Sequence, residues 1–323
     1  MKAVLLNGYG MPADLQVGEV AKPVPKDGEV LVKINATSIN DWDWGLVRGN
    51  PFIIRLFFGL KKPKVNIPGV DISGIIETVG NNVSSFKIGD RVYCDLSECG
   101  FGGFAEYVCV PEKTLSKKPS NISDCDASAL PHAGLLAYQG LVEMGKVKPG
   151  QRILINGAGG GVGTLGIQIL KSYGVKVTGV DSGEKLDLMK SLGYDYVIDY
   201  KKEDFTDNGE KYDLILDTKS NRPVFKYARS LKEKGRYITV GGTMNSLFQI
   251  SFLGLFISIF TGKKLSVLLH KPNKGLEELS RLVEKGQINP IVDGPYEFDQ
   301  IPKLIQYLGD GKHSGKIVVE IEK

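Results

Sequence analysis

A glycine-rich turn is the feature of this 323-residue sequence whose residue types point most directly to chemistry. It follows a predicted strand at 152–156 and opens a helix predicted to run to Tyr173. The turn consists of Gly157, Ala158, Gly159, Gly160, Gly161, Val162 and Gly163. A pyrophosphate needs such a turn, because its charge must approach backbone amides and the helix N-terminus without a side chain between them. Ala158 replaces the first glycine of the strict pattern, and the turn should tolerate this small change.

An acidic residue follows this turn at a suitable distance. Asp181 lies eighteen residues after Gly163, at the end of the next predicted strand, 175–180. A carboxylate there can accept hydrogen bonds from the ribose hydroxyls of an adenosine. Strand, turn, helix, second strand and acid occur in that order. The segment therefore predicts a dinucleotide-binding site rather than an ordinary glycine turn at a helix N-terminus.

The histidines and cysteines give little support to a metal site or a disulfide framework. The three histidines are His132, His270 and His313. They are too few and too dispersed for a standard zinc site, so we expect each to have a structural role. The four cysteines are Cys94, Cys99, Cys109 and Cys125. None forms a CxxC pair, which is typical of reduced thiols in a cytoplasmic protein. We predict no bound metal and a cytoplasmic location.

Charge and hydropathy exclude other classes of protein. The net charge is +4 with acids and bases interleaved, so we expect no nucleic-acid partner. Lys61, Lys62 and Lys64 form the tight basic cluster of the first half, which we interpret as a solvated loop. The N-terminus does not resemble a signal peptide. The longest apolar run, 247–260, is interrupted by polar residues and is too short to span a bilayer. We expect it to be buried or to lie at a subunit contact.

The predicted elements divide the chain into two kinds of structure. Residues 1–120 contain short β-rich runs separated by Gly, Pro and Asp, which indicate a compact, largely antiparallel β domain. From about residue 150, strands alternate with helices, as in βαβ units that form a parallel sheet buried on both faces. A helix at 276–285 and a strand at 316–321 follow, and this last strand is free to return to the first domain.

Motifs spread over nearly the whole chain occur in the order typical of one family. They are ATSINDWDWGLVRG (36–49), IPGVDISGIIETVG (67–80), FKIGDRV (86–92), GGFAEYV (102–108), ALPHAGLLAYQGL (129–141), NGAGGGVGT (156–164), LGYDYVIDY (192–200) and SGKIVVEI (314–321). The sequence resembles the medium-chain dehydrogenase/reductase superfamily, in its zinc-free quinone oxidoreductase branch. The resemblance implies an α/β protein with a GroES-like β-rich catalytic domain, residues 1–120 completed by 271–323. It also implies a Rossmann NAD(P)-binding domain with a doubly wound parallel sheet over 121–270, and a cleft between the two.

The resemblance is also informative about zinc. Zinc members of the superfamily carry Cys at the position of Asn40 and His at the position of Val70, and neither is present. In zinc-free relatives the matching Asn faces nicotinamide and substrate, so the amide of Asn40 is the candidate donor to a developing enolate or phenolate oxygen. Asp43 matches an Asp that follows this Asn in the same relatives. Both residues have simpler explanations, Asn40 as a turn former and Asp43 as a hydrogen-bonding residue that fixes the domain.

The resemblance assigns further cofactor contacts. They are Ser182, Lys185 and Tyr200, which match positions that hold the 2′-phosphate and adenine, together with Val240 and Gly241 at the end of the strand predicted over 236–242. Asp181 would repel a 2′-phosphate and so favours NAD. Lys185 can compensate for that repulsion. We therefore expect NAD(P)H with a preference for NADPH.

The predicted function is a zinc-independent, NAD(P)H-dependent oxidoreductase that transfers a hydride to a quinone or an α,β-unsaturated carbonyl. We expect a small-molecule substrate, a homodimer and no membrane-spanning segment. One alternative is an enoyl-thioester reductase, which is less favoured because residues 45–67 contain no Tyr to act as proton donor. Another is a catalytically silent dinucleotide-binding protein that serves as a redox sensor or scaffold. The glycine-rich turn is compatible with all three.

Overall fold

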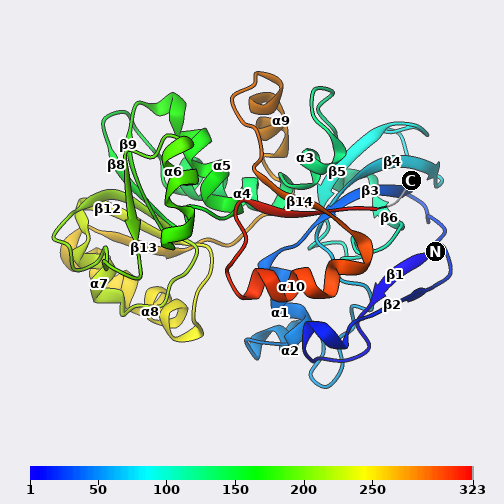
Figure 1. Cartoon of the computed structure of the whole chain (residues 1–323), viewed down its shortest axis with the longest axis horizontal. Coiled ribbons are helices and arrows are strands. Elements are labelled where there is room, and N and C mark those ends of the chain that lie inside the picture. The colour runs from blue at the N-terminus through cyan, green and yellow to red at the C-terminus, as the bar shows by residue number, and fades with distance from the viewer. Residues whose placement is uncertain (322–323) are drawn as a thin grey trace. The chain divides into compact units, whose positions relative to one another are not determined.

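The chain folds into two compact units, coloured blue to cyan and orange to red for the first, and green to yellow for the second (Figure 1). The structure is a computed structural model and describes residues 1–321. The first unit comprises Met1–His132, Pro272–Gly286 and the chain from Pro290 onward. The second comprises Ala133–Lys271 and Gln287–Asn289. Both ends of the chain therefore contribute to the first unit.

The first unit is built around a seven-stranded sheet of order β14-β15-β3-β4-β5-β7, with β6 also paired to β3. A separate two-stranded sheet joins β1 and β2. The strands of the first unit are β1 (Lys2–Leu5), β2 (Gln16–Glu19), β3 (Glu29–Ser38), β4 (Asp71–Val79), β5 (Arg91–Asp95), β6 (Tyr107–Pro111), β7 (Ser116–Lys117), β14 (Val292–Glu297) and β15 (Lys316–Glu320). Among the described strands of this unit only β14 and β15 pair in parallel, so the predicted largely antiparallel β domain is confirmed.

The C-terminal segment completes the core of this unit. The helices are α1 (Asp41–Arg48), α2 (Ile53–Phe58), α3 (Asp124–Ser128), α9 (Leu276–Glu284) and α10 (Ile301–Gly309). Apolar residues of α10 and β15, such as Ile305 and Ile317, lie in one cluster with Ile34 of β3 and Ile72 of β4. Burial of such side chains contributes about 1.5–3 kcal/mol each, so the β domain cannot be complete without the end of the chain.

The first unit extends beyond the predicted boundary at residue 120. The structure places the division between His132 and Ala133, because helix α3 packs on the β sheet of the first unit. Asn35 Nδ2 donates to Asp124 Oδ2 over 3.0 Å, and Ser38 Oγ donates to the carbonyl of Ser128 over 2.9 Å. These contacts join α3 to β3, a pairing that no local sequence pattern specifies.

The second unit is a six-stranded sheet of order β10-β9-β8-β11-β12-β13, the doubly wound order of a dinucleotide-binding fold. Every pair in it is parallel. Its elements are α4 (Pro131–Tyr138), β8 (Arg152–Asn156), α5 (Gly161–Leu170), β9 (Lys176–Asp181), α6 (Leu186–Ser191), β10 (Tyr196–Asp199), β11 (Tyr212–Asp217), α7 (Val224–Arg229), β12 (Leu231–Thr239), α8 (Met244–Thr261) and β13 (Lys264–Val267). Along β8, Ile153 and Ile155 lie in one apolar cluster and Leu154 in another, so both faces are covered as predicted.

The apolar run 247–260 forms most of helix α8, whose outer side is exposed. Only one stripe of α8 is buried, consisting of Ser246, Ile250, Gly254 and Ile257. Of the two expectations for this run, burial within the chain is wrong for most of its apolar side chains, and a subunit contact stays a prediction. The helix is also longer than the run, since it begins after Thr243, whose Oγ1 accepts from Ser246 N over 3.2 Å. With 18 residues and a mean hydropathy of 1.5, α8 has the length and composition of a membrane-crossing helix, although we expected the run to be too short.

Gly254 sets how closely α8 approaches the sheet. A Cβ atom at this position would lie 2.9 Å from the carbonyl oxygen of Leu265 in β13. We expect Gly254→Val to lower the free energy of unfolding by about 1–3 kcal/mol, because the helix must move away from the strand. Ser251→Val, at an exposed position of the same helix, is the matched control. Urea unfolding measures both, and an equal effect of the two variants would contradict this packing.

Candidate functional site

The glycine-rich turn lies at the carboxyl edge of the parallel sheet, between β8 and α5 (Figure 1). Gly157 follows the strand with a φ of +87°, a conformation that side chains other than glycine rarely adopt. A side chain at Gly163 would collide with the backbone of Ala158, so helix and turn are in direct contact. The first amides of α5 have no acceptor within the helix. This arrangement is suited to the pyrophosphate of a dinucleotide.

Asp181 at the end of β9 is bound to the same turn. Gly159 N donates to its Oδ2 over 2.9 Å, and Ser182 N donates to its Oδ1 over 2.8 Å. The ammonium of Lys185 lies 3.4 Å from Oδ1, and both charged side chains are nearly buried. The carboxylate therefore fixes the glycine turn. Its charge is already paired with that of Lys185.

The other candidate adenosine contacts lie around this pair. The Ser182 hydroxyl is buried without a hydrogen bond of ordinary geometry in the described chain. Lys201, and secondarily this hydroxyl, hold the pKa of the Glu184 carboxyl below its ordinary value. Tyr200 is half-exposed, and its backbone amide donates to the carbonyl of Asp181 over 3.1 Å. The structure thus places a hydroxyl and a cation next to Asp181 and attaches the backbone of Tyr200 to the same strand end, and this arrangement fits a nicotinamide dinucleotide.

A buried carboxylate, Asp217, was missed by the sequence analysis. Asn156 Nδ2 donates to its Oδ1 over 2.7 Å, and the Tyr237 hydroxyl donates to its Oδ2 over 2.6 Å. Burial raises the pKa of Asp217, while these hydrogen bonds act in the opposite direction. Its carbonyl accepts from Val240 N over 2.9 Å. Asp217 therefore holds the ends of β8, β11 and β12 in place. The sequence did contain a signal for it, because Asp217 is an acidic residue at the end of a predicted strand, as Asp181 is.

Val240 and Gly241 lie at this same edge of the sheet, directly after β12. The Thr239 hydroxyl donates to the carbonyl of Gly241 over 2.5 Å and to that of Asp217 over 3.0 Å. Together with the glycine turn and the end of β9, they complete a row of strand ends in the second unit.

In the first unit, Asn40 directly precedes α1 and is almost fully buried, with 3% of its surface exposed. Its Nδ2 donates to Asp71 Oδ2 over 3.0 Å and to the carbonyl of Ser38 over 3.3 Å. Its Oδ1 accepts a hydrogen bond from the ammonium of Lys316. The ammonium requires an acceptor and the carboxylate requires a donor, so these two neighbours determine the orientation of the amide. Both hydrogens of Nδ2 therefore have acceptors within the unit.

Asp71 and Lys316 form a buried ion pair, at 3.4 Å, that the sequence analysis did not identify. Asp71 also accepts from Ser38 Oγ and from the backbone amide of His132, each over 3.0 Å. Lys316 also donates to the carbonyl of Ile39 over 3.0 Å. Both charged residues lie inside the motifs at 67–80 and 314–321, among apolar neighbours. A charged residue among apolar neighbours in a predicted strand was the sequence signal for this pair, since buried charges are seldom found without a partner.

Asp43 is fully buried on α1 and binds two backbone amides. Asn40 N donates to its Oδ2 over 2.8 Å, and Gly69 N donates to its Oδ1 over 3.0 Å. Burial raises the pKa of Asp43 to about 7, although both amides and Lys316 lower it. Asp43 therefore joins the start of α1 to the turn before β4, as the hydrogen-bonding alternative described.

The residues at the family's zinc positions do not fit a zinc ion. Val70 is fully buried and offers no ligand atom. The Asn40 oxygen is bound to an ammonium, which would repel a divalent cation at that place.

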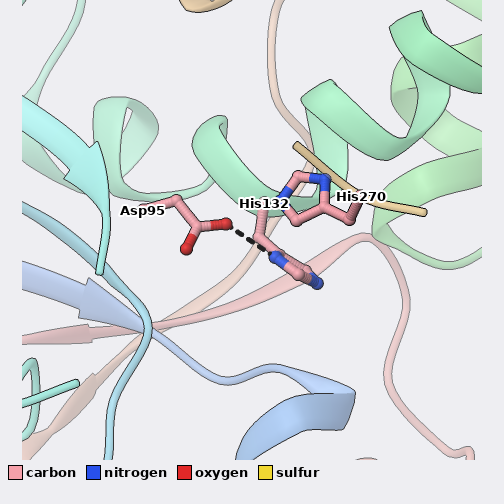
Figure 2. Close-up of side chains that lie close together, drawn as sticks. All are labelled: Asp95, His132 and His270. Atoms are coloured by element: carbon pink, nitrogen blue, oxygen red, sulfur yellow. Dashed lines mark hydrogen bonds and ion pairs between the residues drawn. The ribbon is translucent and has the colours of Figure 1, made fainter. Parts of the chain in front are cut away.

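His132 pairs with a buried carboxylate. Figure 2 shows the ring directed at Asp95, whose Oδ2 lies 2.8 Å from Nδ1. Burial alone would lower the pKa of His132, but the charge and hydrogen bond of Asp95 outweigh it and raise the pKa above 6.5. The charged form of the ring is therefore stabilised inside the first unit.

Comparisons with known proteins agree on one family. The model of the alcohol dehydrogenase GroES-like domain matches residues 26–120, and that of the zinc-binding dehydrogenases matches 192–319. Over 99% of its length the chain is 35% identical to the chloroplastic quinone-oxidoreductase QR1 of Triphysaria versicolor, of which it covers 98%. The chain belongs to the medium-chain dehydrogenase/reductase superfamily, in its quinone oxidoreductase branch. The resemblance inferred from the sequence motifs is thereby confirmed.

Two further relatives of this superfamily are informative. The chain is 33% identical to the chloroplastic NADPH-dependent alkenal/one oxidoreductase of Arabidopsis thaliana, with 99% of this chain and 79% of that protein covered. The structure of the quinone oxidoreductase from Coxiella burnetii superposes with a TM-score of 0.88 at 27% identity, covering 100% of this chain and 99% of that one. The predicted fold, a GroES-like domain with a Rossmann domain, is confirmed.

Removal of Lys316 should leave Asp71 as an unpaired buried charge. We expect Lys316→Met to lower the free energy of unfolding by about 3–5 kcal/mol. The double variant Asp71→Leu with Lys316→Met should lose less, because no charge then remains unpaired. Lys312→Met, at a largely exposed side chain, is the control and should change stability by less than about 0.5 kcal/mol. A single variant as stable as this control would contradict the role of the pair.

The His132 pair should make stability depend on pH. Because the folded-state pKa is raised, its contribution is fully present below about pH 6.5 and is lost as the pH rises through the folded-state value. The difference in unfolding free energy between wild type and His132→Gln should therefore shrink across this range. Asp95→Asn should remove the same dependence. Urea unfolding measures this difference from about pH 5.5 to about pH 8.5, a range that brackets the ordinary pKa of histidine. A difference that stays constant over this range would show that the pair does not titrate.

Proposed function

We propose that this chain is a zinc-independent, NAD(P)H-dependent reductase that transfers a hydride to a quinone or an α,β-unsaturated carbonyl. The observation that carries the proposal lies at the edge of a doubly wound sheet, where the glycine turn is bound to Asp181 and Asp181 is paired with Lys185. Relatives named as a quinone oxidoreductase and an alkenal/one oxidoreductase support both acceptor classes. The expected substrate is a small molecule.

The residues of this chain have distinct roles in the proposed reaction. A bound nicotinamide supplies the hydride. The turn at 157–163 binds the pyrophosphate through backbone amides. We propose Asn40 as the donor to the acceptor's developing oxyanion, through the Nδ2 hydrogen that now makes the longer bond, to Ser38. Lys316 at Oδ1 polarises the amide and makes its hydrogens better donors.

The decisive experiment is a turnover assay. Purified protein is given NADPH or NADH with a panel of quinones and enones, and oxidation of the cofactor is followed. Turnover above the rate without enzyme is the expected result. If every acceptor stays at the background rate while the cofactor still binds, the protein is a silent dinucleotide-binding sensor or scaffold instead.

We propose a preference for NADPH on the basis of the pair formed by Asp181 and Lys185. Because the ammonium lies 3.4 Å from the carboxylate, it offsets the charge that would otherwise repel a 2′-phosphate. The buried Ser182 hydroxyl adds a hydrogen-bond donor in the same place. The preference therefore depends on Lys185 more than on any other cation of this region.

Two substitutions test this charge balance. Asp181→Ser should raise the ratio of kcat/KM for NADPH over NADH by roughly ten- to a hundredfold, because a like charge is removed. Lys185→Ala should lower that ratio. Lys190→Ala, at an exposed position of α6, is the matched control. All ratios are measured with one fixed acceptor, and changes below about twofold in both variants would exclude a ribose contact at this strand end.

We propose that catalysis requires no zinc, given the ammonium at Asn40 and the apolar Val70. Activity should survive dialysis against a strong chelator, which would remove a catalytic Lewis acid. Elemental analysis is the accompanying measurement. Stoichiometric zinc that is lost together with activity would contradict the proposal.

We further propose a cytoplasmic homodimer. In the described chain β13 pairs only with β12, so its outer edge presents unpaired backbone groups that a second copy can bind. Light scattering of the purified protein measures the mass, and a monomer at all concentrations would contradict this assignment.

A further inference from the structure

Helix α8 carries an apolar surface that nothing in the second unit covers. This surface, the α8 face, consists of Met244, Phe248, Phe252, Leu255, Phe256, Ile259 and Phe260. Their exposed fractions range from 42% to 82%. They recur with helical spacing on the side opposite the buried stripe of Ile250, Gly254 and Ile257. A contiguous apolar patch of this kind marks an interaction site in a soluble protein.

A second exposed apolar segment lies in the first unit. The α2 segment consists of Phe52, Leu56, Phe57 and Leu60, exposed by 63%, 60%, 71% and 58%. It is held in place from its inner side, because Ile54 is buried and the Phe58 ring lies 5.5 Å from that of Phe101 in an edge-on contact. The outward orientation of the segment is therefore built into the fold.

Both apolar surfaces lie in stretches of sequence without acidic residues. The chain contains 37 Asp and Glu, but none occurs in 44–70 or in 234–276. Lys61, Lys62 and Lys64 follow α2 directly and are exposed, and Lys263 and Lys264 follow α8. Burial, and secondarily Lys211, lowers the pKa of Lys263, while Glu233, just before the second stretch, acts in the opposite direction. The Lys263 ammonium donates to the carbonyl of Ala228 over 2.7 Å. Aromatic side chains next to lysines, with no acids among them, are typical of surfaces that bind anionic lipids.

We propose that the α8 face binds the surface of an anionic lipid bilayer. The helix lies in the interfacial region and does not cross the membrane. Its inner stripe packs on the sheet, where Gly254 approaches Leu265, and a crossing would expose that stripe and the sheet beneath it. Only the outward side chains are available to the lipid.

Charge favours a bilayer over a second copy of the chain as the occupant. A two-fold contact places the same patch on both subunits. Two α8 faces would then meet next to the exposed Lys264 of each subunit, with no acid in 234–276 to pair with it, whereas anionic headgroups supply the missing negative charge. The unpaired edge of β13 remains available for the proposed dimer.

Vesicle flotation with the full chain tests this proposal. Vesicles of phosphatidylcholine alone are compared with vesicles that contain about one third phosphatidylglycerol, at low and high salt. We expect at least about tenfold stronger binding to the anionic vesicles at low salt, and much less at high salt because counterions screen the lysines. Equal binding to both vesicle types, or binding to neither, would overturn the proposal.

Variants locate the binding surface. Phe252→Ser, Phe256→Ser and Phe260→Ser combined should weaken binding by at least about tenfold, since three exposed apolar rings are lost. The matched control combines Val24→Ser, Ile88→Ser and Tyr196→Ser, which are exposed by 81%, 62% and 53% and lie outside both surfaces. This control should bind as the wild type does.

Folding and association are measured on the same variants. The α8 variant should keep the circular dichroism spectrum and the mass of the wild type in light scattering. A control variant that loses as much vesicle binding as the α8 variant would overturn the proposal. So would an α8 variant that becomes monomeric yet still binds vesicles, because the face would then be a contact between copies.

Discussion

The buried ion pair between Asp71 and Lys316 is the interaction on which the first unit depends. It joins β4, near the start of the chain, to β15 at the end. Two opposite charges removed from water are stable only when all their hydrogen-bonding groups are satisfied, which requires Ser38, Asn40 and the amide of His132 as partners. The orientation of Asn40, our candidate for stabilising a developing oxyanion, is therefore a consequence of how the two ends of the chain meet.

Carboxylates at strand ends serve the same purpose in the second unit. Asp181 holds the glycine turn through the amide of Gly159, and Asp217 joins three strands through Asn156 and Tyr237. A parallel sheet ends all its strands on one edge, where backbone groups lose their partners. Buried acids that accept from these groups make the edge rigid. A rigid edge is suited to a cofactor, because less conformational entropy is lost when the cofactor binds.

In our proposal the two sides of helix α8 have different functions. Its inner stripe closes the sheet, and its outer stripe adds nothing to the core. Such a face lowers solubility unless something covers it, and the neighbouring exposed Lys264 favours a negatively charged surface. Membrane binding of this kind is compatible with the proposed cytoplasmic reductase, because an interfacial helix leaves the folded units intact.

Local patterns in the sequence determined the parallel sheet, the glycine turn with Asp181, and the family, because strand periodicity and tight turns depend on neighbouring residues. The family motifs predicted the first domain and its completion by the C-terminal segment. They also showed that Asn40 and Val70 replace the zinc ligands of the superfamily. Only the tertiary structure decided the partners of Lys316 and Asp217, since these contacts join residues far apart in the chain. It also decided which side of α8 is exposed, because the sequence of a helix that is apolar on all sides does not indicate which side is buried.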